Sequence, residues 1–65
     1  ESGIADIRTI ITQAPAHLSP GGWLLLEHGY EQANAVRALL VSSGFQDVQT
    51  LQDLNGLDRI SLGNI

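Results

Sequence analysis

Apolar residues recur along the first part of the chain at alternating steps of three and four. The positions that form this stripe are Ile4, Ile7, Ile11, Ala14 and Leu18. Such spacing places their side chains on one face of a helix. Because proline has no N–H to donate one turn back, we expect the helix to bend or end near Pro15. The pattern therefore predicts an amphipathic helix over residues 4–18.

A turn and a continuous apolar run come after this helix. Residues 19–22 are Ser-Pro-Gly-Gly, in which proline supplies the fixed φ of the first central position and glycine accepts positive φ at the second. Residues 23–26 are Trp-Leu-Leu-Leu and do not alternate with polar side chains. Continuous apolar runs are typical of interior parallel strands with helices on both faces. We therefore expect residues 23–26 to form a buried central strand rather than a free edge.

The second half of the chain predicts a helix and a pair of strands. Residues 31–43 place apolar side chains on one side of a helix, and Gly44 comes next, where a left-handed residue commonly ends one. Residues 45–54 and 59–62 predict strands. The Asn-Gly pair at residues 55–56 predicts a type I′ hairpin turn, because both residues tolerate the positive φ of that turn.

The order helix, strand, helix and strand hairpin indicates an α/β fold. The second helix would cross between two parallel strands. The last strand would return antiparallel beside the strand that precedes it, or between that strand and the one at residues 23–26. Because no repeat or linker interrupts the chain, we treat residues 1–65 as one unit.

Composition narrows the possible functions. The chain is 43% hydrophobic and 15% charged, which is typical of globular rather than disordered proteins. Cysteine is absent, so disulfides and thiolate zinc sites are excluded. Neither His17 nor His28 has a ligand-like spacing with the carboxylates, so we expect no metal.

Charge and hydropathy argue against two classes of partner. The formal net charge is −4, and Arg8, Arg37 and Arg59 are well separated. Because phosphate binding needs clustered basic residues, we expect no direct contact with nucleic acid. The longest uncharged apolar stretch is much too short to span a bilayer, so we expect no membrane partner.

Three features indicate a C-terminal piece of a larger α/β enzyme, inactive by itself. The first helix needs a sheet on which to bury its apolar stripe. The strand at residues 23–26 resembles a central one, yet the later strands can pair only one of its sides. The third feature is the position of the glycines. Ligands in open α/β sheets bind beyond the carboxyl ends of strands, whereas glycines 21–22 precede that strand. These glycines also do not form a G-x-G-x-x-G loop.

Several segments carry a family resemblance. Residues 18–27, Leu-Ser-Pro-Gly-Gly-Trp-Leu-Leu-Leu-Glu, resemble the end of a class I S-adenosylmethionine-dependent methyltransferase. More narrowly, Glu-His-Gly-Tyr at residues 27–30, Gln32, Ala-Val-Arg at residues 35–37 and Asp-Arg-Ile-Ser-Leu-Gly at residues 58–63 resemble the release factor glutamine methyltransferases, the HemK/PrmC family. The resemblance covers essentially all 65 residues.

The resemblance implies a fold, an activity and partners. The fold would be the C-terminal part of a Rossmann-like methyltransferase sheet, in which the seventh strand lies antiparallel between the fifth and sixth. The activity would be transfer of a methyl group from S-adenosyl-L-methionine to the glutamine of the Gly-Gly-Gln motif in peptide chain release factors, in the cytoplasm. That family's glycine-rich cofactor loop and its Asn-Pro-Pro-Tyr motif do not occur in these residues. The resemblance therefore assigns no catalytic and no cofactor-binding residue to this chain.

Glu27 and His28 are the candidate functional residues, because they lie at the carboxyl end of the strand. A carboxylate and an imidazole at this edge could form a substrate-side wall. The alternative is that Glu27 caps backbone amides and His28 makes structural hydrogen bonds. Other polar and aromatic residues have simpler interpretations as core, helix-end or cross-strand pairing residues; these are Trp23, Tyr30, His17, Asp53, Asp58 and Arg59.

Two further interpretations remain open from the sequence. The chain could come from another class I methyltransferase with a different methyl acceptor. It could also be an interaction module without enzymatic activity, which dimerises through the Leu24–Leu26 strand. In either enzymatic interpretation, the isolated chain would self-associate through an exposed strand edge.

Overall fold

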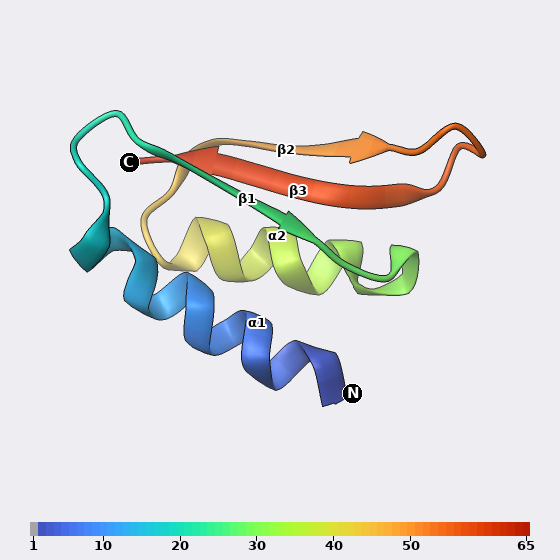
Figure 1. Cartoon of the computed structure of the whole chain (residues 1–65), viewed down its shortest axis with the longest axis horizontal. Coiled ribbons are helices and arrows are strands. Elements are labelled where there is room, and N and C mark those ends of the chain that lie inside the picture. The colour runs from blue at the N-terminus through green and yellow to red at the C-terminus, as the bar shows by residue number, and fades with distance from the viewer. Residues whose placement is uncertain (1) are drawn as a thin grey trace.

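Both helical segments predicted from apolar spacing are helices in the computed structural model, which describes residues 2–65. Figure 1 shows two layers, with the helices stacked against a three-stranded sheet. The elements are α1 (Ser2–Gln13), the short 3₁₀ helix η1 (Ala14–His17), β1 (Trp23–Glu27), the 3₁₀ turn η2 (Tyr30–Gln32), α2 (Ala33–Ser42), β2 (Gln46–Gln52) and β3 (Asp58–Asn64). The α/β order of elements predicted from the sequence is therefore confirmed.

The ends of the helices result from local chemistry. The α-helical part of α1 ends at Gln13, and Pro15 lies in η1, so the predicted interruption near this proline is confirmed. Beyond α2 lies Gly44, whose φ of 94° is the left-handed conformation expected at a helix end. The amide of Gly44 donates to the carbonyl of Val41 at 3.1 Å.

The turn before β1 also forms as predicted. The amide of Gly22 donates to the carbonyl of Ser19 at 2.8 Å, and Gly21 has a φ of 84°. A positive φ at the second central position is what glycine permits without a steric penalty. The turn reverses the chain so that β1 runs back along the sheet.

The sheet has the strand order β1-β3-β2, with β3 antiparallel to both neighbours. The last strand therefore lies between the other two, which is one of the two arrangements predicted from the sequence. Since β1 and β2 are both antiparallel to β3, they run in the same direction, and α2 connects them. The carboxyl ends of β1 and β2 consequently meet at one edge of the sheet.

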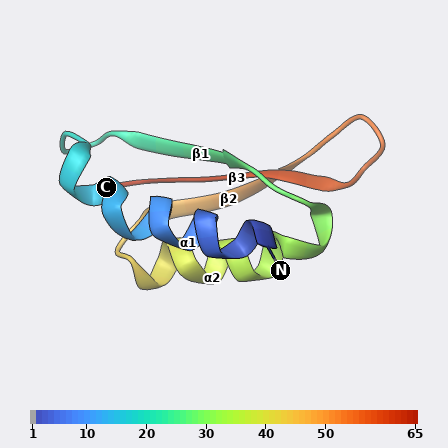
Figure 2. The same cartoon turned by 60° about the horizontal axis from the view of Figure 1, so that its bottom comes forward.

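Within the described residues 2–65, β1 is not buried along its whole length, so the prediction of a continuously buried strand was wrong. Both helices cover the same face of the sheet (Figure 2). Leu24 and Leu26 point toward that face and pack against the core, whereas Trp23 and Leu25 are 44% and 59% exposed. Successive side chains of a strand point to opposite faces, so only an element on the second face could bury both sets. Within the described residues β1 is also an edge strand, paired only with β3.

The hairpin between β2 and β3 differs from the predicted type I′ turn. Gly56 has a φ of 80°, but Asn55 does not have a positive φ. The amide of Gly56 donates to the Asp53 carbonyl at 3.0 Å, and the amide of Asp53 donates to the Leu57 carbonyl at 2.8 Å. The loop therefore has three residues, with glycine in the left-handed bulge position. The Asp53 carboxylate selects this form, because it accepts hydrogen bonds from the amides of Asn55 and Leu57.

The core lies between the helices and the covered face of the sheet. Its buried members are Ile7, Ile11, Val36, Leu40 and Phe45. Two polar residues, His28 and Ser61, are also buried. None of the helices within residues 2–65 has the length and apolar character needed to cross a membrane.

Candidate functional site

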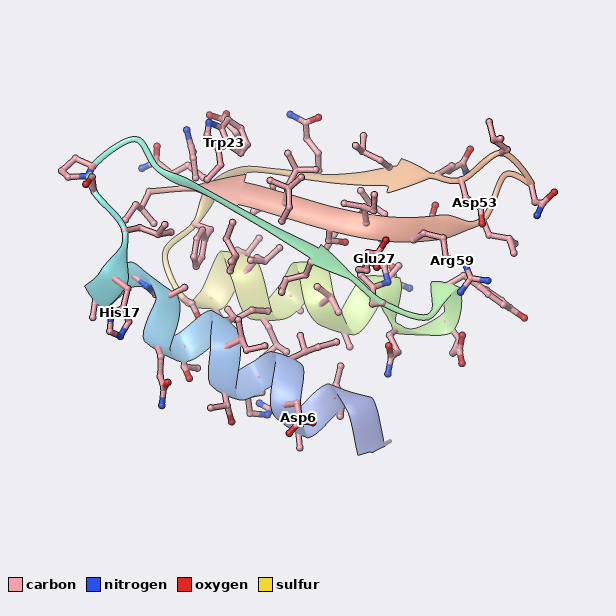
Figure 3. All side chains as sticks on the ribbon, in the orientation of Figure 1. Asp6, His17, Trp23, Glu27, Asp53 and Arg59 are labelled. Atoms are coloured by element: carbon pink, nitrogen blue, oxygen red, sulfur yellow. The ribbon has the colours of Figure 1, made fainter. Side chains whose placement is uncertain are left out.

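The candidate site lies where β1 ends and β3 begins. Glu27 is the last residue of β1 and pairs with Ile60, and the amide of His28 donates to the Arg59 carbonyl at 2.9 Å. These backbone contacts fix the end of β1 against the start of β3. Figure 3 shows Glu27, Asp53 and Arg59 at this end of the sheet, and Trp23 and His17 at the other.

A cleft of about 510 Å³ opens at this edge. It is lined by Glu27, His28, Gly29, Gln52, Asp53, Arg59 and Ile60. The structure therefore places both sequence-predicted residues in one cleft, at the shared carboxyl edge of β1 and β2. Ligands of open α/β sheets bind at this type of edge. The sequence did not indicate that Asp53 and Arg59 join the cleft, because the hairpin brings them there.

Asp53 and Arg59 form an ion pair on one side of the cleft. The Arg59 Nε donates to the Asp53 Oδ2 at 3.2 Å, so the predicted cross-strand charge pair forms between these two residues. The Arg59 guanidinium also lies 5.6 Å from the centroid of the Tyr30 ring, within cation–π range. The Leu57 amide chiefly lowers the pKa of Asp53 below its ordinary value, and Asn55 and Arg59 add to this against an opposing desolvation effect.

His28 is buried, and both of its ring nitrogens are engaged. Its Nδ1 lies 2.8 Å from the Gly29 carbonyl oxygen, and its Nε2 lies 2.8 Å from the Ser61 Oγ. The side chain is 8% exposed. These contacts match the structural interpretation of His28, in which the ring makes structural hydrogen bonds at the start of the loop. Sequence reasoning missed Ser61, because only the register of β1 on β3 places it beside His28.

Glu27 differs from His28 in both its exposure and its hydrogen bonding. Its side chain is exposed in the cleft, and no hydrogen bond to its carboxylate forms among residues 2–65. Capping of nearby backbone amides by Glu27 is therefore not observed in the described part of the chain. An ionised carboxylate is an acceptor with several lone pairs. The cleft can consequently receive N–H groups or a cation from a ligand at Glu27.

The glycine turn before β1 does not fit the phosphate of a nucleotide-type cofactor. Of the two glycines before β1, Gly21 donates its amide to the Ile65 carbonyl at 2.6 Å, and Gly22 accepts from the Ile65 amide at 3.1 Å. A phosphate or carboxylate needs N–H donors, but the Gly21 amide is bonded to Ile65 and the Gly22 amide is bonded to the Ser19 carbonyl. The turn also lies at the end of the sheet opposite the cleft (Figure 1).

Comparison with known proteins shows what the chain is similar to. No family model matches the chain. The chain is 56% identical over 61 residues to the release factor glutamine methyltransferase of Yersinia pestis, and 61% identical over 61 residues to that of Pseudomonas aeruginosa. It is 56% identical over 63 residues to that of Vibrio cholerae. These matches cover 94–97% of this chain but only 22% of each relative.

The chain thus spans about a fifth of the length of the curated relatives that it matches. Identity of this level along nearly the whole chain confirms the narrower of the two resemblances predicted from the residues. The chain is a homologue of one segment of the release factor glutamine methyltransferases.

Proposed function

We propose that this chain is the C-terminal part of a protein-(glutamine-N5) methyltransferase. The whole enzyme would transfer a methyl group from S-adenosyl-L-methionine to the glutamine of the Gly-Gly-Gln motif of peptide chain release factors, in the cytoplasm. The observation that carries this proposal is the 49–61% identity to six release factor glutamine methyltransferases. The chain by itself would be inactive, because the glycine-rich cofactor loop and the Asn-Pro-Pro-Tyr motif that the resemblance implies do not occur in its sequence.

The sheet supports a place in a Rossmann-like methyltransferase domain. The resemblance implies that the last strand of such a domain lies antiparallel between the two strands before it. The order β1-β3-β2 has this arrangement. In the whole enzyme, the unpaired edge of β1 would join a further strand, and additional helices would cover Trp23 and Leu25 on the open face.

The chemistry explains what this segment would contribute. An amide nitrogen is a poor nucleophile, because its lone pair is delocalised into the carbonyl. An enzyme that methylates it must hold its N–H groups with acceptors and aim the nitrogen, which is positioning and electrostatics. Glu27 is an exposed acceptor at the edge of the sheet where ligands bind. We assign Glu27 to the substrate-side wall, with His28 behind it as support.

The proposal is tested on the full-length protein that carries this chain. It is incubated with a peptide chain release factor and S-adenosylmethionine, and the peptide that contains Gly-Gly-Gln is analysed by mass spectrometry. The expected result is one added methyl group on the glutamine side chain. A release factor with this glutamine replaced by alanine should gain none. If the release factor stays unmodified while another protein, a nucleic acid or a small molecule is methylated, the enzyme is a different class I methyltransferase.

A specific observation also supports self-association of the isolated chain. Among the described residues, β1 pairs on one side only, and Leu25 on this strand is 59% exposed. An apolar strand with a free edge is a template for pairing with another chain. We therefore propose that the isolated chain dimerises through the Leu24–Leu26 strand. In the whole enzyme, the same surface would be internal.

A further inference from the structure

A continuous row of polar side chains crosses the sheet beneath the cleft. The His28 Nε2 lies 2.8 Å from the Ser61 Oγ, and the Ser61 Oγ lies 3.1 Å from the Thr50 Oγ1. The Arg37 Nη1 donates to the Thr50 Oγ1 at 2.8 Å. The row therefore links the residue after β1 to Arg37 on α2 through β3 and β2. Ser61, at its centre, is fully buried.

The chemistry of the two ends fixes the direction of every hydrogen bond in this row. At one end, the Gly29 carbonyl can only accept, so the His28 Nδ1 must carry a proton. At the other end, the Arg37 guanidinium can only donate, so Thr50 must accept from it. Thr50 then donates to Ser61, Ser61 donates to the His28 Nε2, and this nitrogen is the unprotonated acceptor.

The opposite arrangement leaves a group without a partner. If the His28 Nε2 carried a proton, Ser61 would accept from it and would have to donate to Thr50. Thr50 would then accept from both Ser61 and Arg37, and its own hydroxyl proton would have no acceptor in the row. Thr50 is half-buried, so its hydroxyl would lose a protein partner in this arrangement. Together with the Gly29 carbonyl, which requires a proton on Nδ1, the row therefore favours the ring form with its proton on Nδ1.

The His28 ring in turn holds the turn after β1. The Gly29 carbonyl accepts from the His28 Nδ1 at 2.8 Å and from the Gln32 amide at 2.9 Å. The Gly29 amide donates to the Gln32 Oε1 at 2.9 Å. Gly29 lines the cleft. The position of this part of the wall therefore depends on which His28 nitrogen carries the proton.

We propose that Arg37, Thr50 and Ser61 form a positioning relay, which fixes His28 as the Nδ1–H tautomer and thereby clamps the Gly29 wall of the cleft. The relay acts through His28, and none of its members touches the ligand. Both ring nitrogens are committed to the protein, so His28 serves as neither a base nor a ligand-binding group. This inference rests on hydrogen-bond geometry and stands whether or not the whole protein methylates release factors.

The tautomer is measured directly by NMR on the full-length protein with ¹⁵N-labelled histidine rings. The His28→Asn variant identifies the signals of this ring. The expected result is a protonated, pyrrole-type Nδ1 and an unprotonated, pyridine-type Nε2. A protonated Nε2 in the unmodified protein would overturn the relay. The tautomer itself is read in the unmodified protein, and the variant serves only to identify the signals.

The clamp is tested with Ser61→Ala, which removes the donor to the His28 Nε2. The Nε2 signal should move toward that of a pyridine-type nitrogen without a hydrogen bond. The Gln32 amide should exchange with solvent roughly two- to tenfold faster, the range expected for loss of one hydrogen bond. The Phe45 amide, bonded to the Leu40 carbonyl at 3.0 Å, serves as the internal reference and should keep its rate.

A matched control is Ser42→Ala, since within residues 2–65 the Ser42 hydroxyl bonds only to the Leu39 carbonyl, at an exposed position of α2. It should leave the His28 signals and the Gln32 exchange unchanged. If Ser61→Ala prevents folding, Thr50→Val removes the next link and should move the Nε2 signal by a smaller amount in the same direction. Unchanged His28 signals in folded Ser61→Ala protein would refute the relay, and an unchanged Gln32 rate would refute the clamp.

Discussion

The Asp53 carboxylate joins the hairpin to the cleft, and its ionisation makes the hairpin sensitive to acid. The amide of Leu57 chiefly lowers its pKa below the ordinary value of 3.8, with Asn55 and Arg59 contributing in the same direction. A depressed pKa in the folded state means that folding favours the charged form. This stabilisation is complete above the unfolded-state pKa, and it is lost as the pH falls from about 4 through the folded-state pKa.

We therefore expect Asp53→Asn to lower the free energy of unfolding at neutral pH, with a difference from the unmodified protein that shrinks as the pH falls below about 4. Urea unfolding at a series of pH values measures this difference. The matched control is Asp58→Asn, because no side-chain hydrogen bond to Asp58 forms within residues 2–65. An acid dependence that is the same in Asp53→Asn and the unmodified protein would contradict the prediction.

The proposed substrate-side wall can be tested by replacing Glu27. Replacing its carboxylate with an amide in Glu27→Gln removes a charged acceptor from the cleft but keeps the shape of the side chain. We expect kcat/KM for release factor methylation by the whole enzyme to fall roughly 10- to 100-fold, the range for a hydrogen bond to a charged group. Asp6→Asn is the control, because Asp6 lies on α1 away from the cleft (Figure 3). Equal activity of both variants would remove Glu27 from the wall.

At the scale of elements, α2 is the helix whose packing against the sheet can be tested. Leu40 is fully buried against the sheet, whereas the adjacent Val41 is 61% exposed. We expect Leu40→Ala to reduce the free energy of unfolding by about 2–5 kcal/mol, through lost burial and the cavity left behind. Val41→Ala should change it by less than about 0.5 kcal/mol. Urea unfolding compares the two variants, and similar losses would mean that this face of α2 is not the one that packs.

At the scale of the whole molecule, the exposed face and free edge of β1 predict that the isolated chain self-associates. Leu25 on β1 and Val41 on α2 are exposed to a similar extent, 59% and 61%. Leu25→Lys should shift the isolated chain from dimer to monomer, because a charge blocks pairing at an apolar strand. Val41→Lys should leave the dimer intact. Light scattering over a concentration series distinguishes these outcomes, and a monomeric unmodified chain would end the dimer proposal.

The whole-protein scale also explains why β1 was mispredicted. Its continuous apolar run indicates a strand buried on two faces, but the described residues supply helices for one face only (Figure 2). The run and the exposure of Leu25 are both consistent with a segment that spans a fifth of its relatives. Under the proposed place in a longer enzyme, the sequence would reflect the surroundings of the whole protein, whereas the exposed area reflects the described residues alone.

The sequence by itself determined the elements whose causes are local. The apolar stripe of α1, the interruption at Pro15 and the positive φ of Gly21 and Gly44 depend on nearest neighbours along the chain. The family resemblance was also readable from the residues alone. So was the placement of Glu27 at the carboxyl end of a strand, because strand direction is set by chain order.

Only the tertiary structure decided what depends on pairing between distant segments. The positive φ of Asp47, 54°, lies at the irregularity between Gln46 and Gln49, where β2 loses register with β3. The contact between His28 and Ser61 spans 33 positions of sequence. A shift of one residue in the β1–β3 register would turn Ser61 to the opposite face. Register is a property of the assembled sheet, so the buried polar row and the cleft above it exist only after the strands have paired.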